Sequence, residues 1–211
     1  IEGIAECTIS DIVDTYYVWE RVNSLGDPRI VYVKRMQANG TPYAGWPNDG
    51  IRASSYSNYD AMQFQAKSVL TNNGIFIAWK DIRTDFILNY YGQILSPTGE
   101  RLWNDEGVSL ADNSREQEFA ALNSDPSGVT VVWAENINGM QDIMASKYSL
   151  TGNPLWNALG NYVVQIDSTQ TNPTIARFAN SGLVAAWSDY TYGESDIYYN
   201  YIRNNGSLIY P

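Results

Sequence analysis

The chain has 211 residues and a formal net charge of −10, from 13 Lys and Arg against 23 Asp and Glu. Because phosphate binding requires clustered basic residues, this charge excludes nucleic acid as an expected partner. The absence of His removes the commonest general base and a common zinc ligand. No apolar run is long enough to predict membrane insertion.

The composition is that of a packed globular protein. Apolar residues make up 44% of the chain and aromatic residues 13%, which argues against disorder. The length suits one large all-β domain. Cys7, the single cysteine, cannot form an internal disulfide, and we expect it to be a small buried residue in an early strand.

The first unit of the predicted structure spans residues 1–60. A strand is expected around Gly3–Ile9, and the run Thr15–Trp19 forms a second one. The segment Val22–Pro28 reads as an insertion. A tight turn is predicted at Asn39-Gly40, because Gly supplies the positive φ that such turns need.

Three closer copies of this pattern follow, in residues 61–114, 115–167 and 168–211. Each copy holds a Gly-led apolar run that closes on Trp, and the tryptophans recur every 54 residues. These runs are Gly74–Trp79, Gly128–Trp133 and Gly182–Trp187. A fixed period of this length indicates an array of like units, none of which buries its apolar faces alone.

The apolar runs decide the fold class. They do not alternate between apolar and polar residues, so each is predicted to be a strand buried on both faces. A sandwich would leave one face of each strand wet. We therefore predict an all-β fold, a β-propeller built of four-stranded antiparallel blades, with about four repeats of roughly 54 residues. The whole chain, 1–211, is expected to form one such domain or a segment of a larger ring.

A glycine turn recurs at the end of the third strand of every unit, at Gly40, Gly99, Gly152 and Gly206. Trp103 and Trp156 follow their glycines by four residues, and Tyr210 has the same offset in the last unit. Trp46 is a looser counterpart in the first unit. We expect these rings to pack in an outer layer and to lock neighbouring blades together.

Acidic residues recur beside the loop that joins the second and third strands. The first set follows each strand tryptophan, and the second set opens the third strand, with Asp27 as a loose match in the first unit. One interpretation is that these carboxylates accept hydrogen bonds from turn N–H groups. The alternative is calcium binding, because paired carboxylates supply oxygen ligands to a hard cation; no other cofactor is expected. The first set is Glu20, Asp81, Glu135 and Asp189, the second is Asp85, Asp142 and Asp196, and the calcium candidates are Asp81, Asp85, Glu135, Asp142, Asp189 and Asp196.

Tyrosines in two loops are candidate ligand-binding residues. They are Tyr56 and Tyr59 in the second loop region, and Tyr190 and Tyr192 near the C-terminus. Aromatic rings stack well on sugar rings, although tyrosines in such loops also serve as ordinary packing.

The motifs together resemble a known group of repeats. Trp187-Ser-Asp189, Asp196-Ile-Tyr198 and Thr151-Gly-Asn-Pro-Leu-Trp156 are similar to the β-propeller repeats of large secreted bacterial proteins. The resemblance covers residues from about 70 to 211, and the first 65 residues fit it poorly. It implies a secreted or cell-surface location, with extracellular display or adhesion rather than a reaction.

These sequence features favour a binding protein over an enzyme. The acidic residues recur once per unit, as structural positions do, so no catalytic residue is nominated. The leading hypothesis is a non-catalytic extracellular propeller for binding, adhesion or display, with glycans or surface proteins as ligands. The alternatives are a carbohydrate-active enzyme module, either a hydrolase or a lyase, and a structural spacer or filament subunit.

The two ends of the array are irregular, which favours a segment of a larger ring over a closed four-bladed one. The last unit lacks the Trp-x-x-x-Gly tail of the second and third, and the first lacks a clear Gln-led opening such as those at Gln117 and Gln170. An open ring leaves two blade faces exposed. The expected partner is the remainder of a larger propeller, a second copy, or a surface protein or glycan.

Overall fold

The computed structural model describes residues 2–10, 14–22, 28–56, 62–83, 86–111, 114–178 and 182–210. All regular elements in these ranges are β-strands, and none of the described segments forms a helix that could cross a bilayer. Cys7 lies in β1 (Glu2–Ser10), but the predicted burial of its side chain falls outside what the structure describes.

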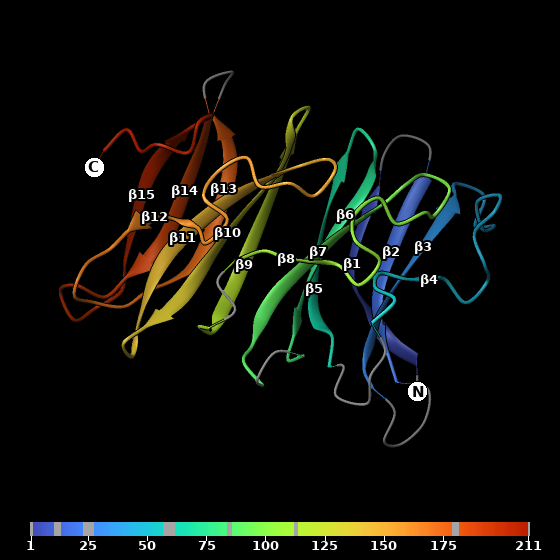
Figure 1. The fold of residues 1–211 in the computed structure, drawn as a ribbon, viewed down its shortest axis with the longest axis horizontal. Helices are drawn as coiled ribbons and strands as arrows, with labels where there is room; N and C mark the ends of the chain where they lie inside the picture. Colours follow the sequence, from blue (N-terminus) through green and yellow to red (C-terminus); the bar gives the residue numbers. More distant parts are fainter. Residues whose placement is uncertain are drawn as a thin grey trace. The chain divides into compact units, whose positions relative to one another are not determined.

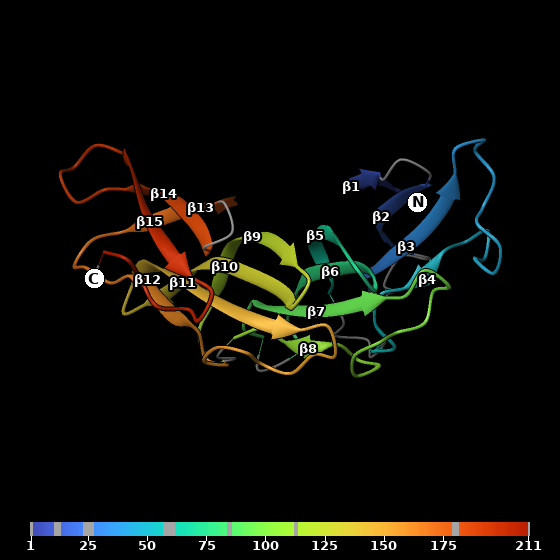
Figure 2. The same ribbon diagram turned by 90° about the horizontal axis from the view of Figure 1, so that it is seen from above.

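The chain divides into two compact units, each larger than one repeat of the sequence, which are described separately. Unit 1 comprises residues 1–109 with 150–152, and unit 2 comprises residues 110–149 with 153–211. Each unit holds two antiparallel sheets, which we call blades, and the strands of each blade follow one another in sequence order (Figures 1 and 2).

Unit 1 contains two four-stranded blades. Blade 1 has the strand order β1-β2-β3-β4, and blade 2 has the order β5-β6-β7-β8. The strands after β1 are β2 (Asp14–Arg21), β3 (Ile30–Gln37), β4 (Ile51–Arg52), β5 (Phe64–Thr71), β6 (Gly74–Asp81), β7 (Asn89–Leu95) and β8 (Val108–Ser109).

Unit 2 contains one four-stranded blade and one three-stranded blade. Blade 3 has the order β9-β10-β11-β12, and blade 4 has the order β13-β14-β15. The bridge from Ile202 to Leu208 has counterparts in the other three blades and closes the turn after the third strand. The strands are β9 (Gln117–Asp125), β10 (Gly128–Ile137), β11 (Met140–Ser149), β12 (Asn161–Val164), β13 (Gln170–Phe178), β14 (Gly182–Asp189) and β15 (Asp196–Arg203).

The second strands carry the core, as their apolar runs predict. Every residue of β6 is buried, and so are the first eight residues of β10, which is what burial of both faces requires. The indoles of Trp79 and Trp133 are 0% and 1% exposed. Burying a ring of this size stabilises the fold by about 2–3 kcal/mol.

The second strands of blades 1 and 4 differ from this prediction. In β2 and β14, buried residues alternate with more exposed ones. The buried side of β2 packs with Ile75, Ile77 and Trp79 of blade 2, and the buried side of β14 packs with Val132 and Ala134 of blade 3. The other side of each sheet remains partly open, so one apolar pattern produces two burial patterns.

The glycine turns and the outer tryptophans form a repeated lock. Gly99, Gly152 and Gly206 have φ values of 90°, 85° and 84°, the left-handed conformation that tight turns need. Indole Nε1 groups donate to a carbonyl oxygen in the turn of the next sheet, confirming the expected locking. The pairs are Trp46 to Pro97 at 2.9 Å, Trp103 to Leu150 at 3.1 Å and Trp156 to Asn204 at 3.0 Å.

Candidate active site

The first set of acidic residues is held by the tryptophans of the same strands. The indole Nε1 of Trp79 donates to Asp81, that of Trp133 to Glu135 and that of Trp187 to Asp189, at 3.2, 3.2 and 3.3 Å. All three carboxylates are buried. Residues two apart on a strand share a face, which places each carboxylate beside its indole.

These carboxylates also organise the following loops. Asp81 Oδ1 accepts the backbone N–H of Arg83 at 2.9 Å, and Asp189 Oδ1 accepts that of Thr191 at 2.9 Å. The arrangement is that of Asx turns. In blade 1, Glu20 instead accepts the N–H of Gln65 at 2.6 Å and pairs with Arg29 at 3.0 Å. Hydrogen bonds from turn N–H groups, one of the two interpretations of this set, are therefore seen at Asp81 and Asp189, whereas Glu135 bonds the Trp133 indole and Glu20 bonds a residue of β5.

The second set pairs with the first across the sheet. Asp142 lies opposite Glu135, and Asp196 lies opposite Asp189. The residue opposite Asp81 is Asn89, whereas Asp85 and Asp27 lie outside the described residues. Within the described segments, no three or more Cys, Asp or Glu side chains gather as a metal site would require. Calcium binding stays a prediction.

Asp142 differs from the other acidic residues of the loops. Its side chain is buried, and its Oδ1 has no hydrogen-bond partner among the described residues. Burial raises the pKa of Asp142 above its ordinary value, and the nearby charge of Asp167 raises it further, against a hydrogen bond from the backbone N–H of Ile166. Asp142 and Asp167 are therefore two interacting carboxyl groups at the end of β12.

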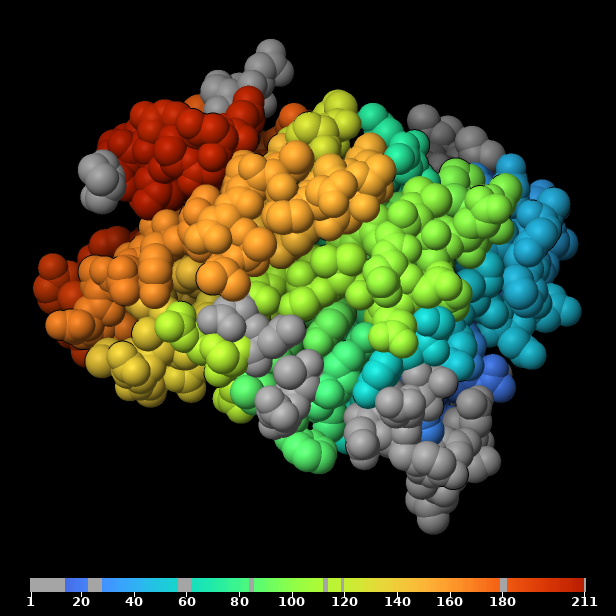
Figure 3. Space-filling view, in the orientation of Figure 1, coloured from blue at the N-terminus to red at the C-terminus, as the bar shows by residue number. Residues whose placement is uncertain are grey.

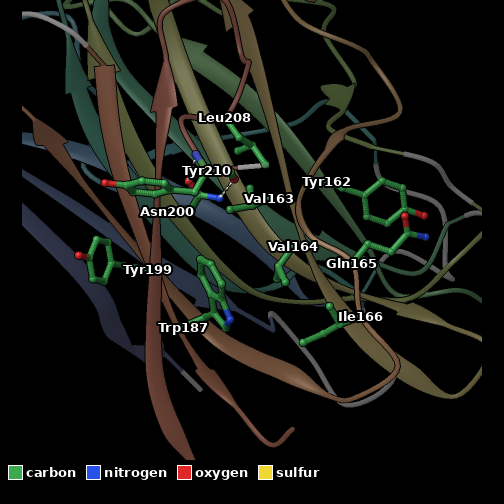
Figure 4. Close-up of a pocket in the computed structure, with 10 residues that line it drawn as sticks. All are labelled: Tyr162, Val163, Val164, Gln165, Ile166, Trp187, Tyr199, Asn200, Leu208 and Tyr210. Carbon is green, nitrogen blue, oxygen red and sulfur yellow. Dashed lines mark hydrogen bonds between the residues drawn. The ribbon is translucent and has the colours of Figure 1, made fainter.

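A pocket of about 400 Å³ lies next to the segment that leads to Asp167, although neither Asp142 nor Asp167 is among the residues that line it. Gln165 and Ile166, which directly precede Asp167, form part of its wall. Figure 3 shows residues after 190 (red) beside the orange segment that contains β12. The full lining is Tyr162, Val163, Val164, Gln165, Ile166, Trp187, Tyr199, Asn200, Leu208 and Tyr210 (Figure 4).

The side chain of Asn200, one of the lining residues, is held by hydrogen bonds to the backbone. The Asn200 side chain donates to the backbone oxygen of Tyr210 at 2.6 Å, drawn as a dashed line in Figure 4, and accepts the N–H of Tyr201 at 2.8 Å. Trp187 contributes its indole, which is 4% exposed, and the rings of Tyr199 and Tyr210 are each 57% exposed. The pocket thus combines aromatic surface with amide groups.

Glycines lie against the strand indoles of blades 2 and 3. In blade 2, a Cβ on Gly107 would lie 2.8 Å from the Trp79 ring, and in blade 3 a Cβ on Gly160 would lie 2.8 Å from the Trp133 ring. These glycines cover the indoles. In blade 4, the edge of Trp187 faces the pocket instead.

The predicted ligand-binding tyrosines do not line this pocket. The ring of Tyr56, in unit 1, lies 4.1 Å from the Arg83 guanidinium carbon, and Tyr59 lies outside the described residues. Tyr190 and Tyr192 are 41% and 78% exposed, in the loop after β14. Sequence reasoning missed Asp167 and Tyr199, which stand outside the repeated motifs, and it did not assign a ligand to Tyr210.

No family model matches the sequence, and no curated protein matches it. Solved structures do match. An endo-arabinase from Bacteroides thetaiotaomicron VPI-5482 is 11% identical, over 92% of this chain and 73% of that chain, with a TM-score of 0.53. A thermostable family-43 glycoside hydrolase is 14% identical, over 98% of this chain and 71% of that chain, with a TM-score of 0.52.

These likenesses confirm the predicted fold class, and the chain folds as an all-β propeller of antiparallel sheets. They also correct the predicted function. The hypothesis of a non-catalytic protein for binding, adhesion or display is wrong, because the solved structures that share the fold are glycoside hydrolases. Counting acidic residues once per repeat led to the error, since equivalent positions in different blades need not have equivalent surroundings.

Proposed function

We propose that this chain is a carbohydrate-active enzyme, or part of one, that hydrolyses glycosidic bonds. The endo-arabinase and the family-43 glycoside hydrolase support the class of reaction. One observation in the chain itself carries the proposal: a buried carboxyl group, Asp142, interacts with a second one, Asp167, which directly follows the wall residues Gln165 and Ile166 of an aromatic pocket. Secretion, which the sequence resemblance implies, fits a polymeric sugar substrate and belongs to this proposal.

Asp142 is assigned the role of general acid. A carboxyl group with a raised pKa keeps its proton at higher pH and can give it to the leaving glycosidic oxygen. The Oδ1 atom without a hydrogen-bond partner is the atom available for that transfer. The N–H of Ile166 holds the group in place.

Asp167 is assigned the complementary role. It is exposed to solvent, in contrast to Asp142. Glycoside hydrolysis uses one carboxylic acid and one carboxylate, the second acting as a base toward water or as a nucleophile toward the anomeric carbon. In either case a water molecule is added across the glycosidic bond. If Asp167 is the nucleophile, Asp142 takes its proton back from that water; if Asp167 is the base, Asp167 takes the proton and the two groups return to their starting states by proton exchange with solvent.

The pocket is assigned to one or two sugar residues. Its volume of about 400 Å³ lies in the usual range for small-molecule sites. The rings of Tyr199 and Tyr210 offer apolar surface to a sugar ring, and the amides of Gln165 and Asn200 offer hydrogen bonds to hydroxyl groups.

The test measures release of reducing ends from arabinan, xylan and their oligosaccharides. We expect Asp142→Asn and Asp167→Asn each to lower kcat by about 10²–10⁴-fold, the usual contribution of an acid or base. Asp196→Asn is the matched control, because Asp196 holds the position of Asp142 in blade 4 and is exposed. The proposal fails if the protein releases no sugar from these substrates, or if Asp142→Asn keeps full activity.

A further inference from the structure

Arginine partners balance most of the buried acidic residues near the ends of the second strands. A buried carboxylate needs such a partner, because an unpaired buried charge is costly. Ion pairs of this kind are present in blades 1, 2 and 3. They are Glu20 with Arg29 at 3.0 Å, Asp81 with Arg83 at 2.5 Å and Glu135 with Arg115 at 3.5 Å. The pairs repeat one arrangement, so their arginines can be compared.

In blade 2 the arginine is part of the packed structure. Arg83 donates to Asp81 and, at 2.8 Å, to the backbone oxygen of Glu106. Its guanidinium carbon lies 4.1 Å from the ring centres of both Tyr56 and Tyr91, a geometry that favours cation–π contact. The Arg83 side chain is only 9% exposed, so it has little surface to offer a ligand.

The arginine of blade 3 is held more loosely. The 3.5 Å between Arg115 and Glu135 exceeds the usual length of a hydrogen bond, and among the described residues this ion pair is the only polar contact of the Arg115 guanidinium group. The Arg115 side chain is 42% exposed. A guanidinium group is a planar fork of N–H donors that matches a carboxylate. The outer N–H groups of Arg115 are therefore open to an anionic ligand.

Arg115 lies one carboxylate away from the proposed general acid. Glu135 is opposite Asp142 in the sheet, and opposite side chains on antiparallel strands share a face, with about 4.5–5.5 Å between their Cβ atoms. The second oxygen of Glu135 accepts the Trp133 indole N–H at 3.2 Å, which fixes its position. Asp142 also accepts the backbone N–H of Ile166, a residue of the pocket wall. Asp142 is therefore linked to the pocket through Ile166 and to Arg115 through Glu135.

The charges of these two regions differ. None of the residues that line the pocket is Lys, Arg, Asp or Glu, so the pocket suits an uncharged sugar. Arg115 offers a positive charge instead. The net charge of −10 on the whole chain repels a polyanion, whereas a single carboxylate in a neutral glycan adds little to that repulsion. The charges therefore favour a neutral chain that carries isolated acidic units.

We propose that Arg115 is a specificity-determining residue that binds the carboxylate of a uronic acid unit in an otherwise neutral glycan. The inference rests on the proposed function, which places the bond to be cleaved at Asp142. A neutral sugar then occupies the pocket, and the uronic acid unit lies on the Arg115 side of Asp142. Guanidinium and carboxylate groups pair through two parallel hydrogen bonds, and Glu135 holds the guanidinium group from its other side.

The test measures binding by titration calorimetry in an Asp142→Asn background, which prevents hydrolysis from consuming the ligand. The ligands are a xylo-oligosaccharide that carries one glucuronic acid unit and the same compound with its carboxyl group reduced to an alcohol. We expect reduction to weaken binding by at least about tenfold, the usual worth of a charge-assisted hydrogen bond. Arg115→Gln should abolish this difference and leave the affinity for the reduced ligand unchanged. Arg115→Lys keeps the charge beside Glu135 but not the fork, so it should recover only part of the difference.

Arg29→Gln is the matched control. Arg29 is 45% exposed and pairs with Glu20, but the residue opposite Glu20 is Val31, so no second carboxyl group lies there. This variant should bind both ligands as the parent protein does, and circular dichroism checks that all variants are folded. The proposal is wrong if Arg115→Gln weakens binding of both ligands equally, if Arg29→Gln has the same effect as Arg115→Gln, or if polygalacturonate binds more tightly than the ligand with one uronic acid unit.

The proposed function and this inference fail in different ways. If the protein with Asp142 intact releases no reducing ends from either ligand but the carboxylate preference depends on Arg115, hydrolysis is refuted and the assignment of Arg115 stands. If the protein hydrolyses both ligands equally well and carboxyl reduction does not change the affinity, the assignment of Arg115 is refuted and hydrolysis stands.

Discussion

Blades 3 and 4 have nearly the same acidic motif, but the surroundings of that motif differ between them. Glu135 faces Asp142 in blade 3, and Asp189 faces Asp196 in blade 4. Asp142 is buried next to Ile166 and Asp167, whereas Asp196 is exposed. The segment that follows β12 makes the difference, because it brings a backbone N–H and a second carboxyl group to Asp142. The raised pKa of Asp142 therefore comes from its burial and from the segment after β12, and not from the acidic motif itself.

Substitution of the strand tryptophans should give the largest difference in the free energy of unfolding between blades 3 and 4. Trp133→Ala is expected to lower the free energy of unfolding by about 3–5 kcal/mol, because it empties a fully packed site. Trp187→Ala should cost about 1–2 kcal/mol less, because part of the Trp187 ring already borders a pocket. Urea unfolding of both variants measures this, and equal losses would contradict the packing difference.

Substitution of Gly160, the glycine that covers Trp133, should give the next largest loss of stability. Gly160→Ala places a Cβ 2.8 Å from the ring, at a φ of 90°. Gly193→Ala has the same φ and meets no atom within 4 Å, so it reports the backbone strain alone. We expect Gly160→Ala to be about 1–3 kcal/mol more destabilising than this control. Thermal or urea unfolding that ranks the two variants equally would show that the glycine does not seal the indole.

A third prediction concerns a carboxylate of blade 3 with the opposite pKa shift. Burial alone would raise the pKa of Asp125, but hydrogen bonds from Lys147, at 2.5 Å, and from Ser127 outweigh it, and the pKa is lowered. A lowered pKa contributes stability above the unfolded value of 3.8, and this is lost as the pH falls through the folded value. Lys147→Met should cost about 1 kcal/mol at pH 7 and less in acid. A loss that does not change with pH would contradict it.

Asp142 should give the smallest effect on stability, with the opposite sign. Its pKa is raised, so the folded protein binds the proton more tightly than the unfolded chain does. The resulting stability is present at low pH and declines as the pH rises from 3.8 through the folded pKa. Asp142→Asn should remove this decline, an effect below about 1 kcal/mol, while Asp196→Asn should leave it. Denaturation curves between pH 3 and 7 that match for parent and Asp142→Asn would refute the assignment.

Much of the fold could be predicted from the sequence, because its signals are local. The Gly-to-Trp runs gave the second strands, and the turn glycines gave the hairpins at the ends of the third strands. The hydrogen bonds from Trp79, Trp133 and Trp187 to the acidic residues two positions later were not predicted, although strand geometry places the two side chains of each pair on one face. The outer Trp lock could also be predicted from the sequence, because the offset of the Trp from the turn glycine is nearly constant.

The candidate site was harder to predict from the sequence. Asp142 was identified as one of a repeated set, but Asp167 belongs to no repeat, and nothing in the sequence indicates that the two interact. Tyr199 reads as an ordinary strand residue. The loop tyrosines seemed better candidates because they are clustered in sequence, yet the pocket is formed by residues from β12, β14 and β15 together with the segment around Tyr210.

The sequence by itself determined the period and the strand order within each blade, since these depend on contacts between residues close in the chain. The tertiary structure decided which copy of each position is sealed and which is open. Burial sums contributions from segments distant in sequence, and the pKa of a carboxyl group depends on that burial and on the charges around it. Identical motifs therefore acquired different surroundings, and only the packed sheets reveal them.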